Sequence, residues 1–240
     1  MAFFDWASPM LQAKPRELDL AALGFANIRY IHWQLGNLTL LQRIYTPVDQ
    51  AFLLWGLICL VIFLTAQFST LDWLTQAALD TSLTLLGTLA MLHLSHDWSK
   101  REGVLWMGWV WAGLMAIGTV LTDWAVIQAW GWVLVNLCEL WLGLCAVGYG
   151  ISGWGMRSRA LLLTGAVHGG AIGVLPWCGS WQFLATGLVF GISLGVLAEL
   201  RWDMCLGSGP VLRPLAPALD YTRDHACEPA LDCALEHLPC

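Results

Sequence analysis

The sequence contains six apolar stretches, each close to the length that crosses a lipid bilayer. They cover residues 51–68, 71–95, 103–122, 124–150, 160–176 and 180–200. A helix needs about 20 apolar residues to span the hydrocarbon core, where the backbone must satisfy its own hydrogen bonds. Hydrophobic residues make up 58% of the chain and charged residues only 12%, which excludes an ordinary soluble domain. We therefore predict an all-α integral membrane protein, built as a six-span helical bundle.

The basic residues indicate how these spans are oriented. Every lysine and arginine falls before the first stretch, between the second and third, between the fourth and fifth, or after the sixth. Short loops rich in Lys and Arg tend to remain in the cytoplasm. Both termini are therefore predicted to be cytoplasmic, in a bacterial inner membrane or an organellar equivalent.

Two segments flank the predicted transmembrane domain, which covers residues 49–202. Residues 1–48 are interpreted as a cytoplasmic or interfacial segment, in which apolar residues recur at broadly helical intervals between Leu18 and Tyr45. This pattern predicts an N-terminal amphipathic helix lying along the membrane interface. A seventh span is disfavoured, since it would bury Arg29 and Arg43. Residues 203–240 begin with glycines and prolines, and we interpret them as a cytoplasmic tail.

Three ionisable residues lie inside the predicted spans: Asp80, Glu139 and His168. A charged side chain costs roughly 3 kcal/mol at the centre of a membrane helix, so such groups usually face one another, a cavity or a cofactor. Asn136 stands three residues before Glu139 and shares its helix face. We interpret these four residues as an intramembrane polar path for a cation or for protons. The alternative is that they hold the bundle together through hydrogen bonds.

Glycines in the last two stretches predict close helix packing. They recur at four-residue spacing, which places small residues on one face of each helix. We therefore expect the fifth and sixth spans to pack against each other through Gly165, Gly169, Gly173, Gly187, Gly191 and Gly195.

Cysteine and histidine residues in the tail form a candidate metal site. Cys233 and His237 are four residues apart, so a helix would place them on one face, and Cys227 and Cys240 flank them. Thiolates and imidazole bind Zn²⁺ or a softer ion such as Cu(I). The spacing matches no standard zinc-finger pattern. The alternative is a reduced tail without metal, because cytoplasmic cysteines rarely form stable disulfides.

A second candidate metal site lies at the cytoplasmic end of the second stretch. His93 and His96 are three residues apart, and Asp97 follows them. A helix would let both imidazoles reach one metal ion. The alternative is a solvated helix end, where protonated histidine is favoured by the helix dipole.

One short motif bears on protease chemistry. Gly150-Ile151-Ser152-Gly153, with His168 later in the chain, resembles the Gly-x-Ser-Gly and histidine elements of rhomboid-type intramembrane proteases. The resemblance covers only these pieces and implies a Ser152 nucleophile. In that family the serine begins a span and the histidine lies two spans later, whereas here Ser152 ends one span and His168 is in the next. This departure argues against a protease.

Three functions fit these observations. The first is a small channel or transporter for a cation, protons or a soft metal ion, to which the thiols of Cys59, Cys138 and Cys145 are suited. The second is a non-catalytic scaffold or assembly factor that binds partner helices or pigments. The third, a metalloenzyme at the membrane interface, would use His93 and His96, but no recognisable catalytic motif supports it. We expect a homo-oligomer or a larger membrane complex, and the net charge of −6 argues against nucleic acid as a partner.

Overall fold

The computed structural model of the chain describes residues 4, 9–13, 29–35 and 38–203. Two compact units divide the chain, Met1–Cys205 and Leu206–Cys240, and the second lies outside the described residues. The metal site that the sequence predicts at Cys227, Cys233, His237 and Cys240 therefore also lies outside them.

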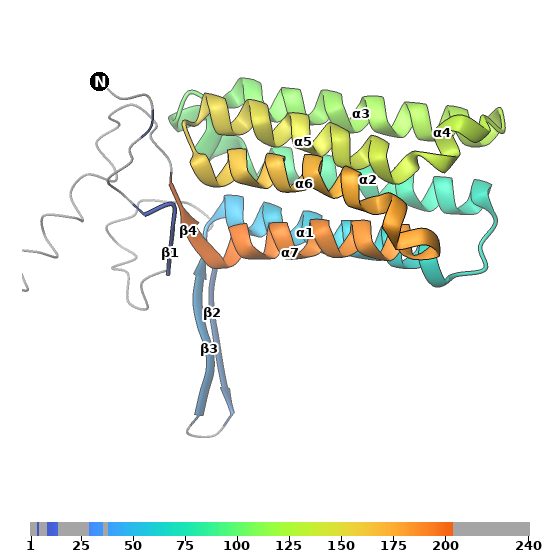
Figure 1. Cartoon of the computed structure of the whole chain (residues 1–240). Helices are drawn as coiled ribbons and strands as arrows, with labels where there is room; N and C mark the ends of the chain where they lie inside the picture. Colours follow the sequence, from blue (N-terminus) through green and yellow to red (C-terminus); the bar gives the residue numbers. More distant parts are fainter. Residues whose placement is uncertain (1–3, 5–8, 14–28, 36–37, 204–240) are drawn as a thin grey trace, which may run out of the picture. The chain divides into compact units, whose positions relative to one another are not determined.

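Within the described residues, long helices run alongside one another (Figure 1). Each helix packs against its neighbours in the chain, and α7 also packs extensively against α1. The helices thus close into a ring in the order α1, α2, α3, α5, α6, α7. Their bounds are α1 Pro47–Phe68, α2 Trp73–Arg101, α3 Leu105–Ile127, α4 Gly131–Val135, α5 Leu137–Gly155, α6 Arg159–Cys178 and α7 Gln182–Glu199.

Five helical segments of the described chain are long and apolar enough to cross a membrane. The fifth, Arg159–Glu199, has 41 residues and comprises α6, the short 3₁₀ helix η2 (Gly179–Trp181) and α7. A straight helix of that length would be about 60 Å long, roughly twice the hydrocarbon thickness. The chain instead turns at Gly179, whose φ of +54° suits glycine, and α7 packs back against α6. The prediction of long apolar helices is confirmed.

The predicted break between the third and fourth stretches is wrong. The sequence analysis placed Asp123 in a connection, but α3 continues through it to Ile127. Residues 122–128 contain neither glycine nor proline, so nothing in them ends a helix. The chain turns at Ala129, where φ is +49°, and the predicted stretch 124–150 is divided among the end of α3, α4 and α5.

The predicted N-terminal amphipathic helix is wrong over Arg29–Tyr45. This segment forms an antiparallel hairpin of β2 (Arg29–Leu35) and β3 (Leu38–Tyr45), with Arg29 opposite Tyr45 and Leu35 opposite Leu38. Aromatic and β-branched residues favour strands, and the sequence between the two strands is Gly-Asn, a dipeptide typical of hairpin turns. The apolar residues of this segment recur only approximately at helical intervals, and the local strand and turn preferences outweigh that pattern.

Capping residues fix the start of the bundle. Thr46 caps α1: its hydroxyl accepts from the Asp49 backbone N–H, and the Asp49 carboxylate accepts from the Thr46 N–H, which forms a capping box. Pro47 occupies the first helical turn, where its missing N–H costs nothing.

A second strand pairing joins a segment that precedes α1 to the segment that follows α7. Strand β1 (Leu11–Ala13) pairs antiparallel with β4 (Leu200–Trp202), which follows α7 directly. Asp203 comes next. Its carboxylate accepts hydrogen bonds from the backbone N–H groups of Arg159 and Ala160 and from the Ser158 hydroxyl. It also forms an ion pair with the Arg159 guanidinium, with 2.7 Å between Nε and Oδ2. Partial burial opposes ionisation, but these hydrogen bonds lower the pKa of Asp203. The residue after β4 thus caps the N-terminus of α6.

The glycines pack differently from the prediction. Gly187 and Gly191 of α7 lie against Phe63 and Leu60 of α1, and Gly165 of α6 lies against backbone atoms of α5. Glycine spacing marks a face where a helix can approach closely, but it does not specify the partner helix. The helices α6 and α7 do pack against each other, as expected, but these glycines make their close contacts with the other neighbour of each helix.

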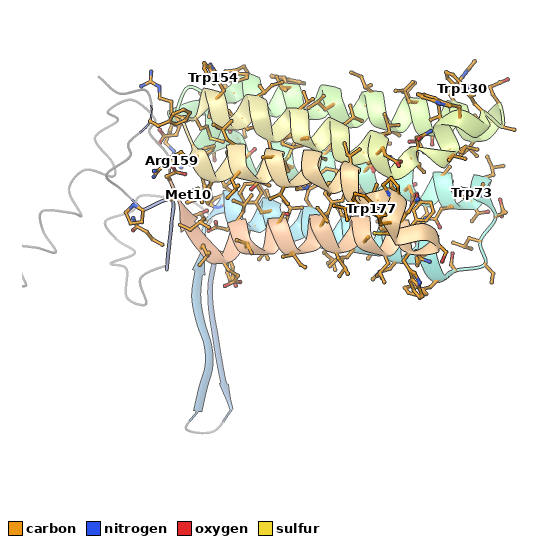
Figure 2. All side chains as sticks on the ribbon, in the orientation of Figure 1. Met10, Trp73, Trp130, Trp154, Arg159 and Trp177 are labelled. Atoms are coloured by element: carbon orange, nitrogen blue, oxygen red, sulfur yellow. The ribbon has the colours of Figure 1, made fainter. Side chains whose placement is uncertain are left out.

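Tryptophans lie near both ends of the bundle. Figure 2 shows Trp154 at the end where Arg159 lies, and Trp73 and Trp130 at the opposite end. Their exposed fractions are 65%, 50% and 48%. Indole rings favour the boundary between lipid and water, so all three positions suit a span end. Trp73 and Trp154 lie near ends of predicted stretches, whereas Trp130 was expected inside the stretch 124–150.

Candidate functional site: a cavity inside the helix ring

The helix ring surrounds a partly open cavity of about 160 Å³, lined mainly by residues of α1, α2, α3, α5 and α7, with Leu161 from α6. Its wall is mainly aromatic and aliphatic, and it includes Trp55, Trp98, Trp111, Tyr149 and Phe190. A cavity of about 150 Å³ is large enough to hold a benzene molecule. The space therefore suits a small ligand or an ion with a few waters.

Polar side chains gather at one end of this cavity. We call Gln76, Asp80, Thr81, Thr122 and Asp123 the acidic end, and all five residues line the cavity. Gln76 Nε2 donates to Asp80 Oδ1 at 2.8 Å, and the Thr81 hydroxyl lies 2.9 Å from both carboxylate oxygens of Asp123. Because Asp80 and Thr81 are adjacent in α2, the two carboxylates are held at the same end, one from α2 and one from α3.

Three buried polar atoms of the cavity wall have no hydrogen-bond partner in the described part of the chain. They are Trp55 Nε1, Gln76 Oε1 and Thr122 Oγ1. Gln76 and Thr122 are only 4% and 6% exposed. Burying an unsatisfied polar group costs about 1–3 kcal/mol, and most such groups are bonded to protein or water. These atoms are therefore available to a polar species inside the cavity.

The three predicted midplane residues do not converge on one site. Asp80 lines the cavity, but neither Glu139 nor His168 is among its lining residues. No hydrogen bond or ion pair joins any two of the three within the described residues. Glu139 lies in the first turn of α5 rather than deep within a span, with a buried Oε2 that lacks a partner among the described groups.

His168 is fully buried between aromatic rings. Its Nδ1 donates to the Thr164 carbonyl oxygen at 2.8 Å, and its ring lies 5.1 Å from that of Tyr149 and 5.0 Å from that of Phe190, measured between centroids. Its Nε2 has no partner among the described residues. Asn136, the fourth predicted residue, stands between α4 and α5, where its side chain donates to the Trp132 carbonyl. Both residues make local contacts rather than extending the acidic end.

The other predicted sites are also placed by the structure. His93 and His96 are both exposed on the last turns of α2. In the part of the chain that the structure describes, no three His, Cys, Asp or Glu side chains are grouped to hold a metal ion. Ser152 accepts a hydrogen bond from Trp111 Nε1 at 2.9 Å, and no hydrogen bond links it to His168 among the described residues. The serine–histidine pair of a protease is not formed.

Asp123 is the site residue that the sequence analysis missed. It was assigned to a connection, and charged residues in connections need no special explanation. The signal that could have identified it is the uninterrupted helical stretch on either side, which places it inside a span.

The long apolar helices define the class: this is a polytopic α-helical membrane protein. Comparison with family models, curated proteins and solved structures finds no match to the chain. Any more specific function therefore has to be argued from the cavity.

Proposed function

We propose that the protein binds a small cation at the acidic end of the cavity and moves it through the helix ring. In this proposal the bundle has six spans, with α6 and α7 crossing separately, and both termini are cytoplasmic because the basic residues cluster on that side. The observation that carries the proposal is that the carboxyl groups of Asp80 and Asp123 line the same buried cavity.

Electrostatics favours a cation at this end. Two carboxyl groups in a region of low dielectric constant repel each other when both are ionised, and a bound cation or proton relieves that repulsion. Gln76 and Thr81 donate one hydrogen bond each toward Asp80 and Asp123, and the unpartnered oxygens of Gln76 and Thr122 can accept from, or coordinate, a positively charged species. The acidic end therefore offers oxygen atoms from four side chains.

Charge movement across a membrane tests the proposal without assuming which cation moves. The purified protein is reconstituted into liposomes, and current is recorded on a solid-supported membrane during steps of H⁺, Na⁺, K⁺ and Ag⁺ concentration. We expect current for at least one ion, and a loss of at least tenfold in Asp80→Asn and Asp123→Asn. The matched control is Asp97→Asn, because Asp97 is an exposed carboxylate on the same helix as Asp80. Wild-type protein that gives no current for any of these ions would overturn the proposal.

A scaffold function is the second candidate, and one observation favours it. Gly170 and Gly173 of α6 are exposed and have open space where a side chain would be. Small residues on a face turned away from the bundle permit close approach of a partner helix. Under this alternative, Gly170→Leu disrupts a co-purifying complex, whereas Asp80→Asn leaves the complex intact.

A further inference from the structure

The cavity wall gathers most of the sulfur-containing side chains of the helices. Four methionines occur between the start of α1 and the end of α7, and all four line the cavity, together with Cys59 and Cys145. Methionine is a flexible apolar residue that fills gaps anywhere in a core. The cavity wall thus combines packing residues with side chains whose sulfur can bind a soft metal ion.

Three of these sulfur residues lie at the same height along the bundle. Between α3 and α5, Trp111 lies against Gly148 and Trp141 lies against Gly118, so the helices are antiparallel and Met115 is level with Cys145. Both residues lie midway between the two contacts.

The remaining contacts bring Cys59 to this height. Ile58 of α1 reaches Gly87 of α2 with the tip of its side chain, and Gln76 of α2 donates to the Thr65 hydroxyl, so Cys59 is level with the part of α2 between Thr81 and Gly87. Thr81 bonds Asp123, and Leu92 lies against Gly108, so residues 113–117 of α3 are also level with Gly87. Cys59, Cys145 and Met115 all line the same cavity.

We propose that Cys59, Cys145 and Met115 form a binding site for a soft monovalent metal ion, Cu(I), inside the cavity. The inference rests on the proposed function, because it names the cation that the ring takes up. The site lines the same cavity as the acidic end. Cu(I) prefers thiolate and thioether ligands, whereas Mg²⁺ and Ca²⁺ need six or more oxygen atoms.

The binding step requires no oxidant or reductant. Each cysteine forms a sulfur–copper bond as its thiol loses a proton to solvent, and Met115 donates a thioether lone pair without losing a proton. One Cu(I) bound by both thiolates therefore releases two protons, and copper remains in the same oxidation state. Metal affinity is accordingly expected to fall as the pH is lowered. Since the tail also carries thiols, these must be replaced in the test so that they do not compete for Cu(I).

The test measures Cu(I) affinity by competition with bathocuproine disulfonate under anaerobic conditions. The background is the full chain with Cys205, Cys227, Cys233 and Cys240 changed to serine. We expect one Cu(I) per chain, and an affinity at least 100-fold lower in Cys59→Ser and in Cys145→Ser. The matched control is Cys138→Ser, because Cys138 is also a buried thiol of α5 but does not line the cavity. X-ray absorption at the copper edge should show only sulfur in the first coordination shell.

The variant Met115→Leu and a comparison with Asp80→Asn keep the result interpretable. Met115→Leu retains the volume and removes only the thioether, and we expect it to bind about tenfold more weakly while it elutes as a folded protein. The site is refuted if Cys59→Ser and Cys145→Ser bind Cu(I) as the background does, or if Cys138→Ser weakens binding equally. If these variants lose Cu(I) but Asp80→Asn leaves the current unchanged, the metal site stands and the role of the acidic end fails. If Asp80→Asn abolishes the current but Cu(I) does not bind, the ring moves another cation.

Discussion

The two faces of α5 differ in how closely they are packed. One face carries Trp141, Cys145 and Tyr149 and forms part of the cavity wall. The other lies against α6 so closely that a methyl group added at Gly153 would be 2.7 Å from the Leu162 backbone nitrogen. Natural cores rarely leave spaces larger than a water molecule. Helix α5 is thus closely packed on one side, and on the other it borders a cavity with unpartnered polar atoms. This difference indicates that the cavity has a function.

The largest effect is expected where the packed face is disturbed. Gly153→Ala places its new carbon against backbone, which cannot rotate away, so we expect a loss of about 3 kcal/mol of unfolding free energy. Gly170→Ala is the matched control, because no atom lies within 4 Å of the added carbon. It should be neutral or stabilising by up to about 1 kcal/mol, since alanine favours a helix over glycine. Unfolding in detergent measures both variants, and equal destabilisation would contradict the packing difference.

The next largest effect concerns the end of the bundle where Asp203 caps α6. Asp203→Asn removes the charge that pairs with Arg159, and we expect a loss of about 2 kcal/mol at neutral pH. Because the folded-state pKa of Asp203 is lowered, its stabilisation is complete above the unfolded-state pKa of about 3.9 and is lost as the pH falls through the folded-state value. The wild type should therefore lose stability in acid by a component that the variant lacks. Unfolding curves at a series of pH values from neutral into acid check this, with Asp97→Asn as the exposed-carboxylate control.

A smaller effect is expected at His168, on the packed side. His168→Leu places an apolar side chain of comparable size between Tyr149 and Phe190. It removes the Nδ1 hydrogen bond to the Thr164 carbonyl, but also the ring nitrogen Nε2 that has no partner among the described residues. We expect a change under about 1.5 kcal/mol and an unchanged cation current. A current that disappears in a folded His168→Leu protein would show that the cation path extends beyond the cavity.

The smallest effect on stability is expected for a substitution that fills the cavity. Ala77 lines it, so the larger side chain of Ala77→Leu has space to enter. We expect a stability change near zero, in contrast to Gly153→Ala, but a loss of at least tenfold in Cu(I) affinity and in current. Destabilisation as large as that of Gly153→Ala would mean that the cavity wall is as tightly packed as the face against α6.

Sequence patterns were sufficient for the long helices and insufficient for what lies between them. Apolar runs fix helices because a lipid-facing backbone has few alternatives, and α1 matches its predicted stretch closely. The hairpin over Arg29–Tyr45 was missed because its residues lie outside that constraint, where strand and turn preferences compete with an approximate helical period. Asp123 was missed because a charge next to a long apolar run was read as the end of the run.

The cavity could not be predicted for a different reason. It depends on which helices are neighbours, and glycine spacing indicates only that a face can be approached closely. Asp80 lines the cavity together with Asp123 from α3, whereas neither Glu139 nor His168 is among the lining residues. The depth of an ionisable residue in its span shows that it is a candidate for a functional site. The order in which the helices pack determines which candidates lie close together.

The pairing of β1 with β4 has a consequence for how the bundle can be assembled. Because α7 packs against α1, every long helix has a neighbour on both sides and the order of the helices is cyclic, and the β1–β4 pairing also joins the segments that flank the bundle in the chain. A circular permutant whose chain is opened between α3 and α4 would keep all these neighbour pairs. During synthesis, the contact between α1 and α7 can form only after the last helix has emerged, so the cavity is completed at the final step of insertion.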